Sequence, residues 1–259
     1  MNLGLNGRVV LLTGGSSGIG ASLAQAYGDE GARVAMTYRT DRVGAERVAR
    51  RVENAGGEGM IVPFDLASDR GADILVETVC DHWGGIDVLV ANAVQWPDRS
   101  PAAGFEALGQ GAWEVGLRAN VEGSFRILQA VIPSMRDREW GRILFLSTGL
   151  AEEGMRGAET YTCAKAALVG LVRSLAWDVG RDGILINILA AGLTLTEANR
   201  ERIPETVRSA MAARTPLERL SYPEELAGPA LFLTSAMNSS ITGEVIREGS
   251  STGRSSHAQ

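Results

Sequence analysis

Seven short apolar runs divide the chain, and segments of helix length with apolar residues at helical spacing separate them. The runs are Val9–Leu12, Ala32–Met36, Gly59–Val62, Ile86–Val90, Ile143–Leu146, Ile184–Leu189 and Glu244–Ile246. They are largely continuous rather than alternating, which is typical of strands that are covered on both faces. The repeated strand–helix order predicts an α/β fold with right-handed crossovers and a doubly wound, seven-stranded parallel sheet flanked by helices.

The length of 259 residues is compatible with one domain, which we expect to extend over residues 1–249. Residues 194–219 are charged and weakly apolar and follow a strand end, which predicts a mobile lid over the carboxyl edge of the sheet. Residues 250–259 are small and polar and lie beyond the last strand, so we expect a flexible tail there.

Composition narrows the function classes. The net charge of −6 argues against unspecific nucleic-acid binding, which normally needs a basic excess. Two cysteines and two histidines give neither a disulfide framework nor a metal site. The sequence has no apolar run of 18 residues and no charged start followed by an apolar stretch. We therefore expect a cytoplasmic protein that binds no membrane and no metal.

A glycine-rich turn, Thr13-Gly-Gly-Ser-Ser-Gly-Ile-Gly20, follows the first strand and precedes an amphipathic helix. Glycine permits a tight turn and a close approach of the backbone to a pyrophosphate, and the helix amino terminus offers free N–H groups. A plain strand-to-helix turn is the alternative. Three separated glycines between a strand and a helix favour dinucleotide binding.

The chain contains one lysine, Lys165, against twenty-four arginines, and it lies four residues after Tyr161. On a helix the two side chains share one face. An ammonium beside a phenol favours the phenolate and thereby lowers the pKa of the hydroxyl from its usual value near 10. The pair is suited to proton exchange with an alcohol or carbonyl, unless Lys165 is an accident of an arginine-rich composition.

The T-G-x-x-x-G-x-G turn, the Tyr-x-x-x-Lys pair and the strand–helix order together resemble the short-chain dehydrogenase/reductase family, from about Leu5 to Gly249. The resemblance implies a single Rossmann-type domain that binds a nicotinamide cofactor. The cofactor-binding positions that it implies are Gly14, Ser16, Ser17, Gly18, Ile19, Gly20, Arg39, Asp65, Leu66, Asn92, Ala93, Tyr161, Lys165, Gly192, Thr194 and Thr196.

The end of the second strand bears on the choice of cofactor. Family members that use NAD have an acidic residue there, whereas this chain has Thr37-Tyr-Arg-Thr40 and no carboxylate before Asp41. Arg39 is placed to bind a 2′-phosphate, which favours NADP(H). An exposed loop arginine is the alternative. Asp65 resembles the family residue that binds the adenine amino group.

The resemblance also assigns the catalytic group. Tyr161 exchanges the proton, and Lys165 holds the ribose and tunes Tyr161. Thr148, thirteen residues before Tyr161, polarises the substrate carbonyl, with Ser147 as the alternative. Asn120 resembles the asparagine that interrupts a helix and holds a water on the proton path; a simple helix kink is the other interpretation.

Several positions depart from the family pattern, two of them near the expected cofactor. Val94 stands where the family has a glycine near the cofactor ribose, and Ala191 replaces the proline of a proline–glycine turn. Trp96 follows Val94 and either lines the substrate mouth or anchors the next loop.

We predict an NADPH-dependent ketone reductase, reversibly a secondary alcohol dehydrogenase, for a specialised-metabolism ketone such as a polyketide. The alternatives are a 3-oxoacyl-[acyl-carrier-protein] reductase and a non-catalytic NADPH-binding sensor or scaffold. An acidic carrier protein would need a basic patch, which Arg118, Arg126 or Arg173 could supply. By analogy with the family we expect a homotetramer or homodimer.

Overall fold

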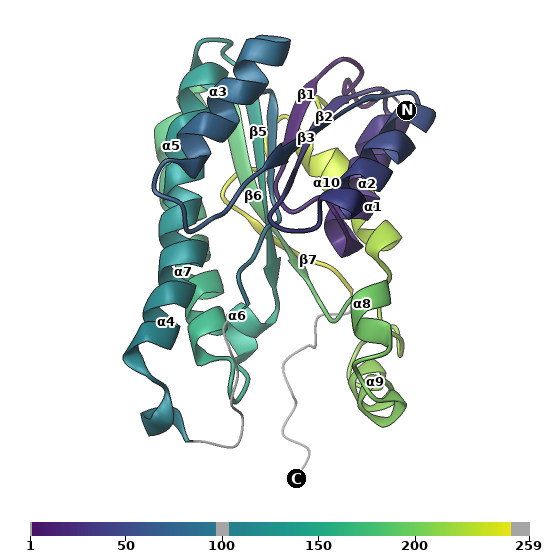
Figure 1. The fold of residues 1–259 in the computed structure, drawn as a ribbon, viewed down its shortest axis with the longest axis vertical. Helices are drawn as coiled ribbons and strands as arrows, with labels where there is room; N and C mark the ends of the chain where they lie inside the picture. Colours follow the sequence, from purple (N-terminus) through teal and green to yellow (C-terminus); the bar gives the residue numbers. More distant parts are fainter. Residues whose placement is uncertain (1, 97–103, 250–259) are drawn as a thin grey trace.

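A parallel seven-stranded sheet forms the centre of the computed structural model, which describes residues 2–96 and 104–249 (Figure 1). The strands are β1 Val9–Leu12, β2 Arg33–Tyr38, β3 Glu58–Pro63, β4 Val88–Ala91, β5 Gly141–Thr148, β6 Ile184–Ala191 and β7 Val245–Arg247. Their order is β3-β2-β1-β4-β5-β6-β7, and every pair is parallel. The predicted doubly wound fold is thus confirmed. The predicted tail, residues 250–259, lies outside the described residues.

Helices cover both faces of the sheet (Figure 1). They are α1 Gly18–Asp29, α2 Arg42–Asn54, α3 Gly71–Trp83, α4 Gln110–Leu117, α5 Gly123–Arg136, α6 Leu150–Glu153, α7 Glu159–Val179, α8 Glu197–Arg200, α9 Glu205–Ala212 and α10 Ala227–Thr234. Four single-turn elements join them: η1 Phe105–Ala107, η2 Arg118–Glu122, η3 Gly180–Asp182 and η4 Pro223–Leu226. Of these, η2 is a π-helical turn between α4 and α5.

The continuous apolar runs supply two cores at once, because successive strand residues point to opposite faces. In β1, Val9 and Leu11 join the core beneath α3, α5 and α7, whereas Val10 and Leu12 join the core beneath α1, α2 and α10. All four residues are at most 3% exposed. This is why these strands read as unbroken apolar stretches.

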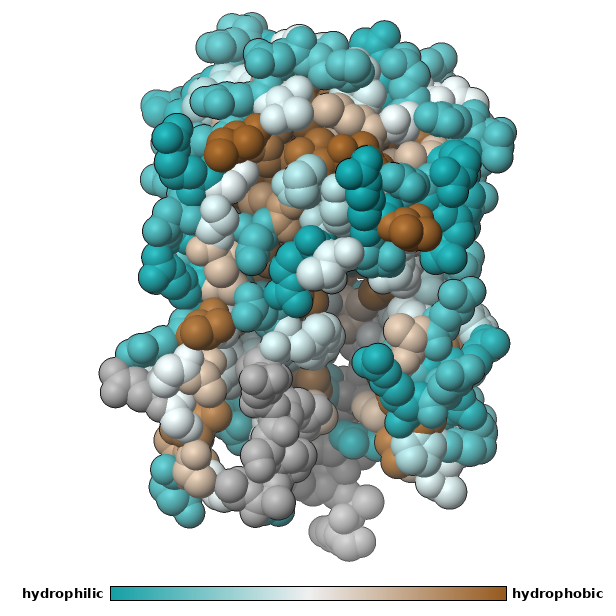
Figure 2. All heavy atoms as spheres, viewed as in Figure 1, coloured by the Kyte–Doolittle hydropathy of each residue, from teal (hydrophilic) through white to brown (hydrophobic). Residues whose placement is uncertain are grey.

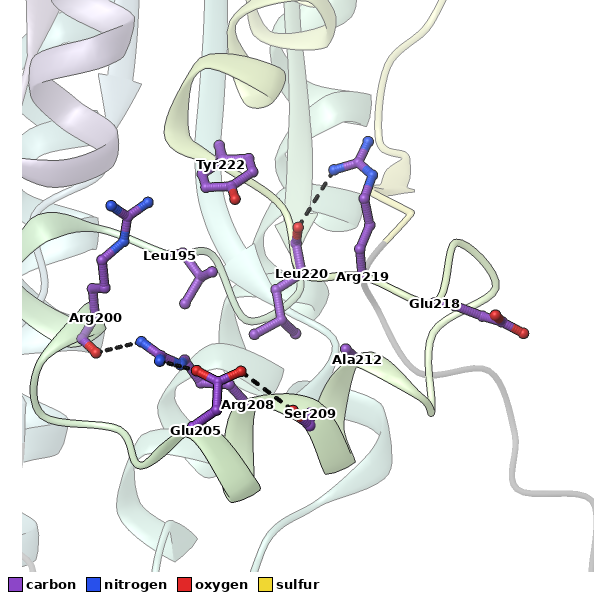
Figure 3. A pocket seen from close by; sticks show the side chains of 10 residues that line it. All are labelled: Leu195, Arg200, Glu205, Arg208, Ser209, Ala212, Glu218, Arg219, Leu220 and Tyr222. Carbon is purple, nitrogen blue, oxygen red and sulfur yellow. Dashed lines mark hydrogen bonds and ion pairs between the residues drawn. The ribbon is translucent and has the colours of Figure 1, made fainter.

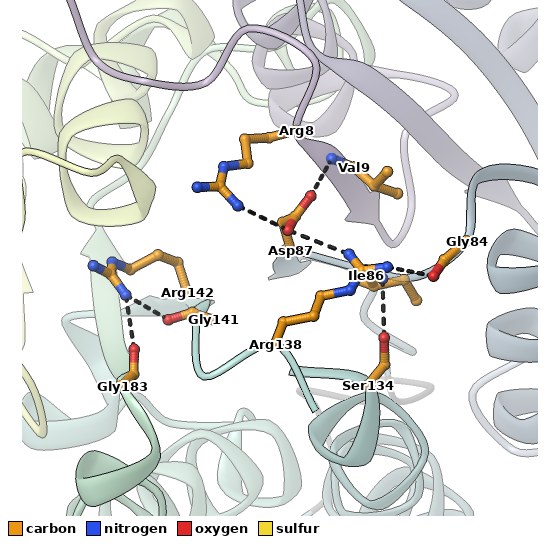
Figure 4. A network of polar contacts seen from close by, with 10 residues as sticks. All are labelled: Arg8, Val9, Gly84, Ile86, Asp87, Ser134, Arg138, Gly141, Arg142 and Gly183. Carbon is orange, nitrogen blue, oxygen red and sulfur yellow. Dashed lines mark hydrogen bonds and ion pairs between the residues drawn. The ribbon is translucent and has the colours of Figure 1, made fainter. Parts of the chain in front are cut away.

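Asp87 ties together the amino edge of the sheet, away from the glycine-rich turn (Figure 4). Its carboxylate accepts hydrogen bonds from the Val9 backbone N–H at 2.8 Å and from Arg8 at 3.0 Å. Arg138 approaches the same carboxylate at 3.3 Å. Nearby, the buried guanidinium of Arg142 donates to four backbone carbonyls. The polar contacts at this edge are structural. In sheets of this kind, ligands bind at the opposite edge, at the carboxyl ends of the strands.

Residues 194–219 form α8 and α9, which stand beyond the carboxyl ends of the strands (Figure 1). Figure 2 shows the molecule hollowed beside this segment. Thr194 forms an isolated parallel bridge with Ser221, and the Leu195 N–H donates to the Ser221 carbonyl at 2.8 Å. The two ends of the segment are therefore paired with each other.

Candidate functional site

The glycine-rich turn lies where the strand order reverses, between the neighbouring strands β1 and β4. Gly14 and Gly18 have positive φ angles of 72° and 54°, which disfavour residues with a side chain. A Cβ on Gly20 would lie 2.1 Å from the Gly14 carbonyl oxygen. The turn therefore needs these glycines, and it lies at the topological switch point where such sheets bind ligands.

Asn92, directly after β4, fastens this turn. Its side-chain amide donates to the carbonyls of Thr13 at 3.0 Å and Gly14 at 2.9 Å. In return, the Thr13 hydroxyl accepts from the backbone N–H groups of Asn92 and Ala93, each at 3.0 Å. The Gly14 N–H donates to the hydroxyl of Thr37 at 2.9 Å. The roles of Thr13 and Thr37 were not predicted; the threonine directly before the glycines was the available signal.

The amino terminus of α1 fits an anionic ligand. The helix begins at Gly18, and Ser17 precedes it as an N-cap without a side-chain capping hydrogen bond. The first backbone N–H groups of a helix lack intrahelical acceptors and carry the positive end of the helix dipole. Ser17 is exposed, and Ser16 and Ile19 are half-buried. Together with the glycine turn, these groups match the pyrophosphate of a dinucleotide.

An arginine, Arg39, directly follows β2, and the nearest carboxylate, that of Asp41, is already hydrogen-bonded. Arg39 is exposed immediately after the strand, and no ion pair to it occurs among the described residues. Asp41, the nearest acid, is the N-cap of α2, and its carboxylate accepts from the Gly44 N–H at 2.9 Å. Asp41 is therefore engaged in capping, whereas the guanidinium of Arg39 faces solvent.

Tyr161 and Lys165 lie on α7, and the Lys165 side chain reaches the carboxyl end of β5. The ammonium of Lys165 donates to the Leu146 carbonyl at 2.7 Å, and Lys165 is 5% exposed. Its nitrogen is 6.0 Å from the centre of the Tyr161 ring. The predicted common face of the pair is confirmed, and it adjoins the strand that ends at Ser147 and Thr148.

Burial sets the protonation of this pair. It raises the pKa of the Tyr161 hydroxyl to about 12 and lowers the pKa of the Lys165 ammonium to about 8. The sequence predicted a depressed phenol pKa, and in this structure the shift is the opposite. Desolvation disfavours the charged form of both groups, and the ammonium does not offset it at this distance. At neutral pH Tyr161 is a protonated phenol, which is the form that donates a proton.

Thr148 and Ser147 differ in their surroundings. Thr148 is half-buried at the end of β5, and its hydroxyl oxygen accepts from the Leu150 N–H at 3.3 Å, which leaves the O–H proton available to donate. The Ser147 hydroxyl is buried without a hydrogen-bond partner among the described residues. Both hydroxyls lie two residues or fewer beyond the carbonyl that Lys165 contacts.

Asn120 lies in the π-helical turn η2, so the expected interruption between two helices is present. Its side-chain amide donates to the carbonyls of Gly116 at 2.9 Å and Gln95 at 2.8 Å, and its oxygen accepts from the Gln95 N–H at 2.9 Å. This side chain therefore anchors the backbone that follows β4, a contact that the sequence did not indicate.

The first residues after β6 reach the glycine turn. A Cβ on Gly18 would lie 3.2 Å from the methyl group of Thr196, so Thr196 contacts the phosphate-binding region. Thr196 caps α8 in a reciprocal arrangement with Asn199. The buried Thr194 hydroxyl donates to the Gly192 carbonyl at 3.3 Å. The predicted cofactor residues of β1, β4 and β6 thus lie along one edge.

The remaining predicted residues, Asp65 and Leu66, follow β3. The Asp65 carboxylate is exposed and accepts from the Ala67 N–H at 2.9 Å. The Leu66 carbonyl approaches Gly123 so closely that a Cβ there would lie 2.6 Å from it. Asp65 is thus at the same edge of the sheet, with its second carboxylate oxygen directed to no partner in the described part of the chain.

A pocket of about 470 Å³ opens within the segment that contains α8 and α9, between these helices and residues 218–222 (Figure 3). Its lining consists of Leu195, Arg200, Glu205, Arg208, Ser209, Ala212, Glu218, Arg219, Leu220 and Tyr222. Arg208 donates to the Arg200 carbonyl at 2.6 Å and contacts Glu205, so α8 and α9 are tied together. The lining contains none of the predicted catalytic or cofactor-binding residues. This pocket is distinct from the site at the end of β5.

Comparisons with known proteins agree with this geometry. A family model described as enoyl-(acyl carrier protein) reductase matches residues 14–247. The chain is 32% identical over 247 residues to the (2S)-[(R)-hydroxy(phenyl)methyl]succinyl-CoA dehydrogenase subunit BbsD of Thauera aromatica, and the match covers 94% of this chain and 96% of that protein.

Two solved structures are similar over nearly the whole length. A 7α-hydroxysteroid dehydrogenase in complex with NADH and 7-oxo glycochenodeoxycholic acid superposes with a TM-score of 0.89 at 28% identity, covering 97% of this chain and 96% of that one. A 3-oxoacyl (acyl-carrier-protein) reductase of Agrobacterium tumefaciens C58 with NADP bound gives 0.88 at 30% identity, with 96% of each chain covered. The two relatives hold different nicotinamide cofactors.

Proposed function

Because this chain belongs to the short-chain dehydrogenase/reductase family, we propose that it is an NADPH-dependent ketone reductase that also runs in reverse as a secondary alcohol dehydrogenase. The family makes it an oxidoreductase that acts on CH–OH and C=O groups with a nicotinamide cofactor. One observation carries the proposal: Lys165 reaches the end of β5 and lies 6.0 Å from the ring centre of the protonated Tyr161, at the same edge as the glycine turn.

The chain's own residues account for binding and proton transfer. The glycine turn and the amino terminus of α1 hold the pyrophosphate, and Lys165 holds the ribose. When bound, the cofactor supplies the hydride that adds to the carbonyl carbon. Tyr161 donates its hydroxyl proton to the carbonyl oxygen, which gives the alcohol, and Thr148 donates a hydrogen bond that polarises the same oxygen. Asn120 completes the route by which Tyr161 regains a proton.

The preference for NADPH rests on Arg39 and Asp41. The Asp41 carboxylate already caps α2, so it is not free to bind the adenosine ribose hydroxyls. Arg39 is exposed at the position that meets a 2′-phosphate, for which a guanidinium is the suited partner. Steady-state kinetics of Arg39→Ala should show kcat/KM for NADPH falling roughly tenfold or more while kcat/KM for NADH changes little. An equal effect on both cofactors would contradict this preference.

Single substitutions distinguish the role of the Thr148 hydroxyl from that of the Ser147 hydroxyl. Thr148→Ala should reduce kcat for ketone reduction by a factor on the order of 10²–10³, because it removes a donor to the developing charge. Ser147→Ala should have little effect, since it removes a buried hydroxyl that lacks a partner in the described structure. The reverse ranking would move the role to Ser147.

A ketone from specialised metabolism, such as a polyketide, is the proposed substrate class. Val94 and Ala191 depart from the family pattern at positions expected near the cofactor, which supports a pocket of altered shape. The name of the relative from Thauera aromatica contains a hydroxy(phenyl)methyl group, which supports a substituted ketone.

Reduction of 3-oxoacyl groups on a carrier protein is the second candidate, favoured by the similarity to the Agrobacterium reductase. Two of the three arginines predicted for its basic patch are paired, whereas Arg173 is exposed and forms no ion pair in the described part of the chain. Arg118 and Arg126 form ion pairs with Asp69 at 2.8 and 3.0 Å, and Arg126 also pairs with Glu122 at 3.0 Å. A partner of high negative charge therefore finds few unpaired cations there.

Consumption of NADPH tests the proposal directly. Absorbance at the reduced-cofactor band is followed with a panel of aryl ketones, cyclic ketones and 3-oxoacyl thioesters, and NADPH binding is titrated separately by fluorescence. Turnover of ketones supports the reductase. Tight binding of NADPH without consumption on any carbonyl would instead favour the sensor or scaffold.

For assembly, we propose a cytoplasmic homotetramer or homodimer that uses α5 and α7. Trp177 on α7 is 90% exposed and Phe125 on α5 is 47% exposed, which leaves large apolar groups on both helices uncovered in one chain. Light scattering of Trp177→Glu should show a smaller assembly than the wild type.

Among residues 2–96 and 104–249, no helix has the length and apolar character that a membrane crossing requires.

A further inference from the structure

Trp96 lies flat against the proposed proton donor. The ring centroids of Trp96 and Tyr161 are 4.6 Å apart, and their planes meet at 24°. Tyr161 is 8% exposed, whereas Trp96 is 65% exposed. The indole therefore covers one face of the phenol ring and directs most of its own surface outward, immediately beside the reacting hydroxyl.

The backbone that carries Trp96 is fixed from the body of the protein. Both polar backbone groups of its neighbour Gln95 are hydrogen-bonded to the side chain of Asn120, at 2.8 and 2.9 Å. Asn120 is 5% exposed and sits in the π-helical turn η2. The indole is thus placed by a buried anchor next to the site.

We propose that Trp96 is a specificity-determining wall of the substrate site and that it selects ketones with a planar aromatic or conjugated group attached to the carbonyl carbon. The inference rests on the proposed function, because it needs a carbonyl oxygen at the Tyr161 hydroxyl. The indole is larger than the phenol it covers, so it extends a flat apolar surface beyond Tyr161. A planar substituent lying along that surface buries apolar area and gains a favourable aromatic contact.

A saturated ring of the same size covers similar area but makes no aromatic pair. This difference distinguishes recognition of the substituent by Trp96 from mere exclusion of water from Tyr161 by the indole. If the indole only kept water from Tyr161, its removal would slow all ketones alike. If it recognises the substituent, its removal changes the ratio between aromatic and saturated ketones.

The test compares acetophenone with cyclohexyl methyl ketone, which share one carbon skeleton. The ratio of their kcat/KM values is measured for the wild type, Trp96→Leu and Trp96→Phe, with folding checked by thermal melting. Trp96→Leu should lower the aryl-to-cyclohexyl ratio by about 2- to 12-fold, the range of a single aromatic pair. Trp96→Phe should retain most of the ratio. An unchanged ratio in Trp96→Leu overturns the inference, even when both rates fall.

A binding measurement distinguishes this inference from the proposed function. The products 1-phenylethanol and 1-cyclohexylethanol are titrated by calorimetry into the protein with NADPH bound, where hydride transfer to the cofactor is blocked. Tighter binding of 1-phenylethanol that is lost in Trp96→Leu supports the wall, even if no ketone is reduced and the reductase proposal falls. Equal binding of the two alcohols to the wild type overturns the wall, whatever the turnover.

Discussion

The buried ammonium of Lys165 should make the stability of the protein rise with pH. The pKa of Lys165 falls from 10.5 to about 8 on folding, because burial disfavours the charged form. Between these values the unfolded chain binds more protons than the native one, so the free energy of unfolding increases with pH. At about 1.4 kcal/mol for each pKa unit the full effect is on the order of 3 kcal/mol, of which about 2.5 kcal/mol is reached by pH 10.

The assay is urea unfolding of the cofactor-free protein from pH 7 to pH 10, for the wild type and Lys165→Met. Methionine keeps the stem and removes the titrating group. The free energy of unfolding of the wild type, minus that of Lys165→Met, should increase by about 2.5 kcal/mol over this range. Contributions from other groups cancel in the difference. Arg173→Met, on an exposed part of the same helix, should leave the wild-type slope unchanged. Parallel curves for the wild type and Lys165→Met would refute the reasoning.

Two further predictions concern the turn and the amino edge. Gly20→Ala should weaken NADPH binding at least tenfold in a fluorescence titration, because its Cβ would lie 2.1 Å from the Gly14 carbonyl oxygen. The control Gly170→Ala, whose Cβ has open space in α7, should bind NADPH normally and gain about 0.5–1 kcal/mol in the free energy of unfolding. Equal NADPH affinities of the two variants would contradict the role of the turn. In urea unfolding, Asp87→Ala should lower the free energy of unfolding by about 3 kcal/mol, since it leaves Arg8 and the Val9 N–H without their buried acceptor. Its kcat should stay near the wild-type value, and a loss of kcat with intact stability would contradict the structural role of Asp87.

The strands could be predicted because burial on both faces leaves a local signal, the unbroken apolar run. The end of β6 could not. This strand continues beyond its apolar run to Ala191, which pairs with Thr148 at the end of β5. A ladder extends wherever a neighbouring strand offers partners, and the sequence of one strand does not contain that information.

The proximity of Tyr161 and Lys165 could be predicted because a spacing of four residues places two side chains on one helical face. The contacts of Asn120 could not, because its partner Gln95 lies 25 positions earlier in the chain. The same holds for the hydroxyl of Thr37 at the Gly14 N–H. The burial that raises the pKa of Tyr161 could not be predicted either, since an ammonium four residues away is a local cause and burial depends on the whole fold.

The stacking of Trp96 on Tyr161 also depends on contacts between residues that are distant in the sequence. The sequence left a substrate wall and a loop anchor equally open for this residue. The choice depends on where the chain turns after β4, and Asn120 fixes that turn from another element. Residues whose role depends on one local spacing were therefore accessible from sequence, and residues positioned by distant partners were not.

Reduction of a ketone by Tyr161→Phe tests the central claim most directly. Phenylalanine keeps the ring beneath Trp96 and removes only the proposed proton donor. Tyr222→Phe, in the separate pocket between α8, α9 and residues 218–222, is the matched control. The rate of NADPH consumption at saturating ketone should fall by roughly 10²–10⁴ in Tyr161→Phe, with NADPH affinity within a few-fold of wild type and the control unaffected. A rate for Tyr161→Phe within a few-fold of wild type would contradict the assignment of Tyr161 as the proton donor.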